Sequence, residues 1–287
     1  MRYEAPKTLE RAIQLLSGAN GKARVLAGGT DLLIQMRAGR AVPELIVDVK
    51  GIPEMRSVAA EAGTYRVGAA VSCMELIENE AFARTWPGVV DGAKYIGSVQ
   101  VKGRATLGGN LCNASPAADG VPSLIAAGAI ARISGPNGRR EEPIENFVLG
   151  PGQTSLAPGE LVVSFLLPRR EPLSGDAYLR FTPRTEMDIA VVGAAINLTL
   201  DRAGICTRAR VCLGAVAARA LLVPEAAAAL LGTRVDERAL QRLAATASAA
   251  CKPIDDKRGT KEFRIKVAGV MAERAATIAL ERARRSN

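Results

Sequence analysis

The 287-residue chain contains no histidine. Imidazole serves in Ser-His-Asp triads, in Cys-His pairs and in histidine metal sites, so its absence excludes all three. An enzyme built from this chain must therefore rely on carboxylates, lysines or a cofactor. If the protein is a redox enzyme, we expect an organic cofactor to carry the chemistry.

Cysteine is scarce, and no CxxC pair occurs. Without such pairs, zinc or iron–sulfur ligation by this chain is not expected. We therefore expect no metal site in it. Cys206 and Cys212 are separated by an even number of residues in an expected strand. We therefore expect them to share one face as a buried, reduced pair rather than a disulfide.

Long apolar runs are also missing. No stretch approaches the roughly eighteen residues that a membrane span needs, and the N-terminus has no apolar segment typical of a secretion signal. We expect no integral membrane segment and a cytoplasmic location. Aromatic residues make up only 3% of the chain, whose net charge is +9. Because the basic residues are dispersed and aromatic stacking platforms are few, a solvated surface or subunit contact is favoured over nucleic-acid binding.

The apolar patterns divide the chain into three expected parts: 1–55, a small α/β unit; 56–172, a larger α+β unit; and 173–287, a sheet with helices. The expected helices cover residues 8–16, 32–38, 72–77, 87–97, 117–127, 224–231, 236–250 and 260–284. The expected strands cover residues 24–26, 45–49, 64–71, 129–134, 139–144, 161–167, 190–200 and 205–216.

Two glycine-rich stretches are the strongest functional signals. Residues 105–119 read ATLGGNLCNASPAAD, and residues 25–33 read VLAGGTDLL. Glycine lets a backbone approach a ligand closely, and the amides of a turn and a helix start can face an anion. Two such loops far apart in the chain favour one long ligand held from two sides. The structural alternative stays open here: an ordinary strand-to-helix turn upstream and a capped helix downstream.

The side chains around these loops limit the kinds of ligand that the loops could bind. The upstream loop has neither a Gly-Lys-Ser/Thr sequence nor GxGxxG, so a P-loop or Rossmann site is not indicated. Thr30 can donate to a phosphate oxygen, whereas Asp31 is interpreted as a helix cap or a contact to a neutral hydroxyl. Asp119 suits a ribose or ribityl hydroxyl. Neutral hydrogen-bonding groups surround the downstream glycines: Thr106, Asn110, Asn113 and Ser115.

These motifs resemble those of the FAD-binding subunits of molybdenum hydroxylases, such as the medium subunit of aerobic carbon monoxide dehydrogenase and the flavin domain of xanthine dehydrogenase. The resemblance covers essentially the whole chain, in order. It rests on residues 26–33, 100–102, 105–110, 114–119, 160–164 and 181–190.

The resemblance implies an α+β fold, with a two-subdomain FAD-binding fold of the PCMH/VAO type followed by a C-terminal three-stranded antiparallel sheet with a helical bundle. It implies FAD extended between the first two parts, and no catalytic side chain. The two glycine loops would wrap the diphosphate, Ser115 and Asp119 would contact sugar or ribityl hydroxyls, and Ile96 and Val162 would pack against the rings. The residues that it assigns to FAD are Leu26, Ala27, Gly28, Gly29, Thr30, Asp31, Leu32, Leu33, Ile96, Ala105, Thr106, Gly108, Gly109, Asn110, Ser115, Asp119, Val162 and Arg184.

The resemblance also implies a role in electron transfer. Substrate would be oxidised at a molybdopterin on a large partner subunit, and electrons would pass through [2Fe–2S] clusters on a small partner subunit to the FAD. An external acceptor, a quinone, NAD⁺ or O₂, would then receive them, in an assembly expected to be a dimer of heterotrimers.

Two positions depart from the family pattern. Gly103-Arg104 replaces the Arg-Asn-type pair before the loop, and Thr182 stands where the xanthine dehydrogenase branch has a lysine, with Arg184 the nearest cation. The second departure weakens a prediction of xanthine chemistry or NAD⁺ use. Two other interpretations stay open: a stand-alone FAD-dependent oxidase or reductase, and a basic scaffold that binds nucleic acid.

Overall fold

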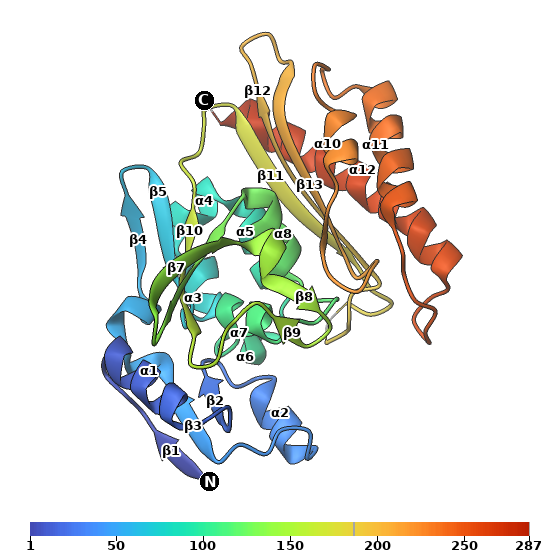
Figure 1. Cartoon of the computed structure of the whole chain (residues 1–287). Coiled ribbons are helices and arrows are strands. Elements are labelled where there is room, and N and C mark those ends of the chain that lie inside the picture. The colour runs from blue at the N-terminus through green and yellow to red at the C-terminus, as the bar shows by residue number, and fades with distance from the viewer. Residues whose placement is uncertain (186, 287) are drawn as a thin grey trace.

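The computed structural model of the chain describes residues 1–185 and 187–286, so Glu186 in the motif 181–190 and the terminal Asn287 lie outside it. The described residues form sheets of three, five, four and two strands, covered by helices. In Figure 1 the N-terminal sheet lies at the bottom, the five-stranded sheet at the left and the four-stranded sheet at the upper right. The expected α+β fold is confirmed.

The N-terminal part is a small parallel sheet in the order β1-β3-β2 with helix α1 against it. Thr8 begins α1 as expected, because its side chain accepts a hydrogen bond from the Arg11 amide. The helix buries Leu9, Ala12 and Leu16 at helical spacing. The elements are β1 (Arg2–Glu4), α1 (Leu9–Gly18), β2 (Ala23–Leu26), α2 (Leu32–Arg37), β3 (Leu45–Asp48), and the short 3-10 helices η1 (Val49–Gly51) and η2 (Pro53–Arg56).

The second part is an antiparallel sheet in the order β4-β5-β10-β6-β7, with β10 at its centre. Ser72 and Glu75 form a reciprocal capping box at the start of α3, where a helix was expected. The elements are β4 (Val58–Glu61), β5 (Thr64–Gly68), α3 (Cys73–Glu78), α4 (Glu80–Thr85), α5 (Pro87–Lys94), α6 (Val99–Lys102), α7 (Leu107–Cys112), α8 (Gly120–Ala127), β6 (Ile130–Gly135), β7 (Gly138–Pro143), α9 (Ile144–Phe147), β8 (Val148–Gly150), β9 (Gln153–Thr154) and β10 (Leu161–Leu167).

Helix α8 begins at Gly120, so the expected start at residue 117 is wrong. The Ala118 amide instead bonds to the Ser115 carbonyl in a turn. The Asn110 side chain then accepts the Gly120 amide, which gives the helix a cap from outside its own segment. The expected end is confirmed, because Gly128 has a left-handed conformation with φ of 70°.

The C-terminal part is an antiparallel sheet covered by three helices. The sheet has four strands rather than the expected three, because Leu221 and Leu222 pair with Leu213 and Cys212. A two-residue strand carries too little alternation to be found from the sequence. The elements are β11 (Ser174–Phe181), β12 (Val192–Leu200), β13 (Cys206–Gly214), β14 (Leu221–Leu222), α10 (Pro224–Ala228), α11 (Glu237–Ala250) and α12 (Lys261–Arg285).

Cys206 and Cys212 are both buried and free, but the expectation that they share a face is wrong. Cys206 packs with the core under α11 and α12, whereas Cys212 packs with the core of the second part. A bulge in β13 is the reason: Leu200 pairs with Cys206, but the next pair joins Thr199 to Arg208. The extra residue reverses the alternation of side chains along the strand.

The predicted boundaries 1–55, 56–172 and 173–287 stay a prediction, since one apolar core runs through both of the first two parts. None of the helices in residues 1–185 and 187–286 combines the length and the apolar character that crossing a membrane requires.

Gly175 determines how closely α12 approaches the sheet. A Cβ at this position would overlap the Ala279 carbonyl and the Ala283 amide of α12. We expect Gly175→Ala to lower the free energy of unfolding by about 1–3 kcal/mol, because backbone on both sides must move. Chemical denaturation measures the change. Gly18→Ala is the control: no atom lies within 4 Å of its Cβ position, and stability unchanged relative to that control would contradict the packing argument.

Candidate functional site

A cleft of about 410 Å³ lies between the N-terminal part and the second part. Both glycine loops line it, the first after β2 and the second around the start of α7. A third wall comes from residues 152–162, which lead into β10. The tertiary structure therefore brings the two loops to one cavity, as the sequence predicted.

The loops touch each other directly. A Cβ on Gly28 would overlap the carbonyl of Arg104, at the entry to the second loop. The second loop is fixed in turn by an isolated bridge between Ser72 and Thr106 and by a hydrogen bond of 2.7 Å from the Cys73 amide to the Ala105 carbonyl. The absence of a side chain at residue 28 is therefore a packing requirement between the two parts.

The buried carboxylate of Asp48 and its two partners, Lys50 and Tyr3, hold the first loop in place. Lys50 Nζ donates to the Ala27 carbonyl at 3.1 Å and forms an ion pair of 2.8 Å with Asp48. Tyr3 donates its hydroxyl to the same carboxylate at 2.6 Å. Burial acts to raise the pKa of Asp48, but the hydrogen bonds from Lys50 and Tyr3 outweigh it, and the pKa lies below its ordinary value. The loop also needs Gly29, whose φ is 79°.

The second loop leads into α7 through a cap. Thr106 Oγ1 accepts the Gly109 amide at 2.9 Å, so the cap satisfies one of the first amides of the helix, which have no intrahelical acceptors. Gly108 packs on the backbone of Ala69, where a Cβ would overlap the carbonyl. Gly109 also lines the cleft, but its Cβ position meets only Thr106 Oγ1, at 3.2 Å. Of these two glycines, the first serves packing and the second keeps the cleft open.

Two acidic groups line the cleft, and their surroundings differ. Desolvation raises the pKa of the Asp31 carboxyl, although the residue as a whole is exposed. Asp31 stands at the N-cap position of α2, as one of its two interpretations predicted, but its side chain makes no capping hydrogen bond. Glu160 is instead held in a paired arrangement with Arg140, at 2.8 Å, and hydrogen bonds from that guanidinium lower its pKa.

Most of the residues predicted to bind FAD line this cleft: Ala27, Gly28, Gly29, Thr30, Asp31, Leu32, Ile96, Ala105, Thr106, Gly108, Gly109, Asn110 and Val162. The others lie elsewhere. Leu26 and Leu33 flank the first loop, and Ser115 Oγ accepts the Ala117 amide. Arg184 lies in the exposed segment after β11, with Nη2 donating to the Met187 carbonyl.

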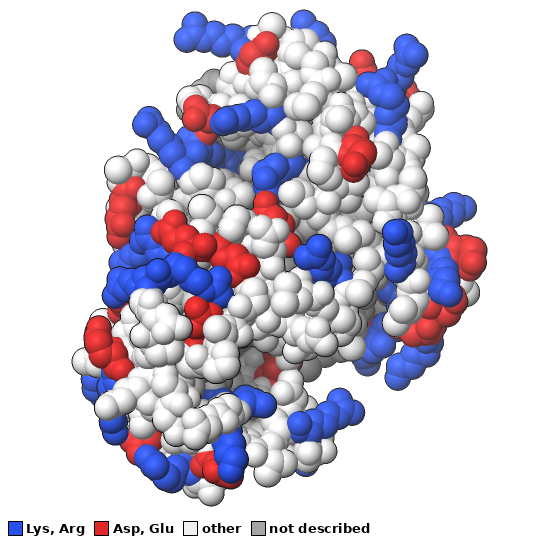
Figure 2. All heavy atoms as spheres, in the orientation of Figure 1, with Lys and Arg blue, Asp and Glu red and all other residues white. Residues whose placement is uncertain are grey.

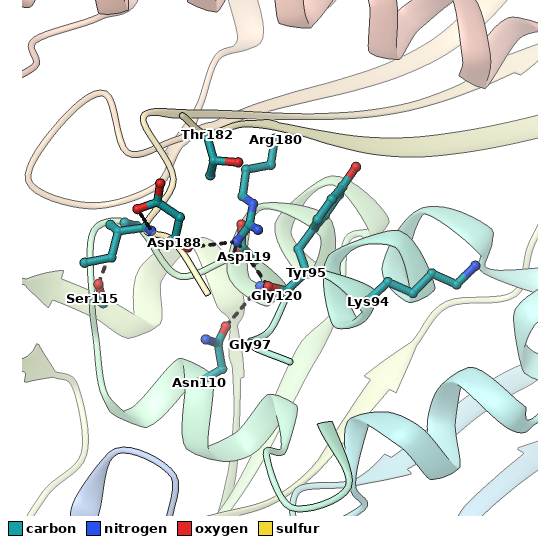
Figure 3. Close-up of polar contacts among 12 residues, drawn as sticks. Lys94, Tyr95, Gly97, Asn110, Ser115, Asp119, Gly120, Arg180, Thr182 and Asp188 are labelled. Carbon is teal, nitrogen blue, oxygen red and sulfur yellow. Dashed lines mark hydrogen bonds and ion pairs between the residues drawn. The ribbon is translucent and has the colours of Figure 1, made fainter. Parts of the chain in front are cut away.

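Asp119 belongs to a buried network between the second and third parts (Figure 3). Tyr178 donates to one carboxylate oxygen and Arg180 Nη1 to the other, both at 2.8 Å. Burial raises the pKa of Asp119 to about 6, although both partners favour its ionised form. Arg180 Nη1 also donates to the carbonyl of Tyr95, the residue before Ile96 in the cleft wall.

Two features of the site were not predicted from the sequence: a hydrogen bond across the cleft, and the third wall. Gln35 of α2 donates to Asn113, at the end of α7, at 2.9 Å. Gly152, Leu156 and Glu160 line the third wall. A Gln on a short helix and a loop without a motif carry no local signal, so only the tertiary fold could reveal them. Among residues 1–185 and 187–286, no group of Cys, Asp and Glu is arranged to hold a metal ion.

Comparisons with known proteins agree with this geometry. Residues 1–170 match the family model described as the FAD binding domain in molybdopterin dehydrogenase, and residues 177–279 match the CO dehydrogenase flavoprotein C-terminal domain. The carbon monoxide dehydrogenase medium chain of Hydrogenophaga pseudoflava is 34% identical over 98% of this chain and 97% of that protein. A putative xanthine dehydrogenase FAD-binding subunit of Escherichia coli K12 is 31% identical over 97% of this chain and 95% of that protein.

The fold agrees equally well. The solved carbon monoxide dehydrogenase of Hydrogenophaga pseudoflava contains a chain that superposes with a TM-score of 0.94, at 34% identity, over 98% of each chain. Fold and site thus define a flavoprotein of the oxidoreductase class, with FAD as its cofactor. The chain belongs to the family of FAD-binding subunits of molybdenum hydroxylases. The expected family and the expected FAD-binding fold are confirmed.

The contribution of Asp48, which holds Lys50 under the first loop, to the stability of the chain should depend on pH. The folded pKa of Asp48 is lowered, so its contribution to stability is complete above the unfolded pKa of about 3.9 and is lost as the pH falls through the folded value. We expect Asp48→Asn to cost about 1–3 kcal/mol at pH 7 and progressively less below pH 4. Urea denaturation across this range measures the difference. Glu44→Gln, which removes the exposed partner of Lys22, is the control, and a cost for Asp48→Asn that does not change with pH would contradict the assignment.

Proposed function

We propose that FAD lies extended in the cleft, with its diphosphate between the loops at residues 26–33 and 105–110. The observation that carries the proposal is the meeting of both loops at one cavity. The first amides of α7 and the hydroxyl of Thr30 supply neutral donors for phosphate oxygens. Ile96 and Val162 supply apolar surface for the rings.

The surroundings of two glycines indicate whether the cleft can hold FAD. At Gly109 a side chain would enter the cavity, and at Gly28 it would separate the loops. The missing side chain at Gly109 matches a backbone that must lie close to a diphosphate, whereas Gly28 is needed for the loops to meet. Asn110 contributes less directly, because its side-chain oxygen already accepts the Gly120 amide. The residues present therefore fit the cofactor.

The proposal also includes three predicted FAD contacts from residues that do not line the cleft. Ser115 and Asp119 would face sugar or ribityl hydroxyls, and Arg184 would be the nearest cation to the flavin. Since both oxygens of Asp119 have protein partners, a direct contact to FAD would use a remaining lone pair. Its second role is to hold Arg180, and through it the Tyr95 carbonyl, in place.

We propose that the subunit transfers electrons from [2Fe–2S] clusters on a small partner subunit to an external acceptor. Substrate oxidation would occur at molybdopterin on a large partner subunit, in a dimer of heterotrimers. The relatives named as carbon monoxide dehydrogenase medium chain and xanthine dehydrogenase FAD-binding subunit support this division of labour. FAD when bound supplies the redox chemistry, and the chain binds, orients and shields it. A cytoplasmic location is part of the proposal, and the free cysteines suit a reducing compartment.

Gly109→Val tests the position of the cofactor. The new side chain would fill space on the cleft side, so we expect the flavin content of the purified chain to fall at least about tenfold, which corresponds to 1.4 kcal/mol. The measurement is the flavin absorbance per chain. Gly103→Val is the matched control, because residue 103 does not line the cleft and its Cβ position meets only the Gln100 carbonyl, at an ordinary 3.5 Å.

Thermal denaturation of the flavin-free variants distinguishes flavin lost because the chain unfolds from flavin lost because the site is blocked. Equal midpoints with low flavin in Gly109→Val alone support the site. Full FAD occupancy in Gly109→Val would contradict it.

The electron-transfer role is tested by purifying the tagged chain from its native host. We expect two further chains to co-purify, and the visible spectrum to show iron–sulfur as well as flavin absorbance. If the isolated FAD-loaded chain instead oxidises a reduced substrate by itself, a stand-alone oxidase or reductase replaces the proposal.

A further inference from the structure

A second hollow, of about 470 Å³, lies at the far end of the second part and shares no lining residue with the FAD cleft. It is bounded by the end of α8, by the connection between β10 and β11, and by the outer ends of β12 and β13. In Figure 2 the upper part of this face is hollowed, with Lys and Arg side chains gathered around it.

The strand register explains why this end of the sheet is polar. Three cross-strand rows lie on the same face: Ser174–Thr199–Arg208, Asp176–Asn197–Arg210 and Tyr178–Ala195–Cys212. The third row is buried in the core shared with α8. The first two rows carry hydroxyl, amide and guanidinium groups that line the hollow, and they also carry the buried carboxylate of Asp176, which lies beside it. The bulge in β13 aligns Arg208 and Arg210 with this face.

Four arginines line the hollow, and two of them already have carboxylate partners. Arg170 pairs with the buried Asp176 at 2.8 Å, and Arg210 pairs with Glu145 at 2.9 Å. Among residues 1–185 and 187–286, Arg169 and Arg208 have no such ion pair. The carboxylate in the lining is Glu171, which is exposed. The unpaired charge of the lining is therefore positive on the side of β13.

A buried donor in the lining also lacks a partner. Trp86 is 2% exposed, and its Nε1–H has no acceptor in the described part of the chain. The guanidinium of Arg170 lies 4.7 Å from the centre of this indole ring, which fixes the cation at the wall of the hollow. Leaving a buried N–H unsatisfied destabilises the folded chain, so a ligand that supplied an acceptor to Trp86 Nε1 would be favoured.

We propose that this hollow binds a phosphorylated small molecule. Its lining offers guanidinium, hydroxyl and indole donors, and the phosphate group is the ligand with the most acceptor oxygens and charge for such a set. The volume exceeds what a single phosphate needs, and leaves room for the organic part against Pro168, Ala209 and Leu231. The site belongs to the subunit independently of the FAD cleft.

The test uses the full chain loaded with FAD, so that the first cleft is occupied. Isothermal titration with pyrophosphate, at constant ionic strength, should give a dissociation constant below about 1 mM. Arg208→Ala and the double variant with Arg169→Ala should weaken binding at least about tenfold, while the flavin content stays unchanged. Arg238→Ala is the control, because it removes the same charge from an exposed site on α11.

Each result decides the proposal. A large loss of pyrophosphate affinity in Arg208→Ala and in the double variant, but not in Arg238→Ala, supports the proposal. It is overturned if the FAD-loaded wild type does not bind pyrophosphate, if Arg208→Ala binds like the wild type, or if Arg238→Ala loses as much affinity. Tricarballylate, a tricarboxylate whose charge near neutral pH is close to that of pyrophosphate, distinguishes phosphate recognition from general attraction of anions, and equal affinity for both overturns the phosphate assignment. The flavin content separates any such failure from a failure of the FAD site.

Discussion

The cleft depends on the close approach of two backbones, at Gly28 and at Arg104. No Cβ fits between them, so the loops can meet only where the chain has glycine. Their contact sets the width of the cavity between the first two parts. The groups around it keep that width: Lys50 holds the first loop through the Ala27 carbonyl, and Gln35 reaches Asn113 across the opening. A side chain at residue 28 would therefore act on the whole cleft rather than on one contact.

The C-terminal part is joined to the same framework through buried and partly buried charges. Asp176 of β11 accepts the Gly88 amide at the start of α5, and Arg282 of α12 pairs with Asp91 of that helix at 2.6 Å. Arg180 adds a third connection through Asp119. Buried ion pairs are costly to break, because removing one partner leaves an uncompensated charge. The sheet that carries α12 is consequently fixed relative to the wall of the FAD cleft.

Local chemistry made much of the fold predictable. Thr8, Ser72 and Gly128 mark helix ends through groups that lie within three or four residues of their targets. The start of α8 was mistaken because its cap comes from Asn110, ten residues earlier. The shared face expected for Cys206 and Cys212 failed for a related reason, since the bulge in β13 is defined by its pairing with β12. Errors arose wherever the partner lies outside the local segment.

The sequence by itself determined the glycine loops, the family and the need for a cofactor, because short motifs and missing histidines are visible in one dimension. Most helices and strands were likewise determined by period and caps. The tertiary structure confirmed that the loops share one cleft, and it alone decided that residues 152–162 form a third wall and that a separate basic hollow forms beside β13. A cavity is defined by surfaces from distant segments, and its shape depends on packing that no single stretch of sequence contains.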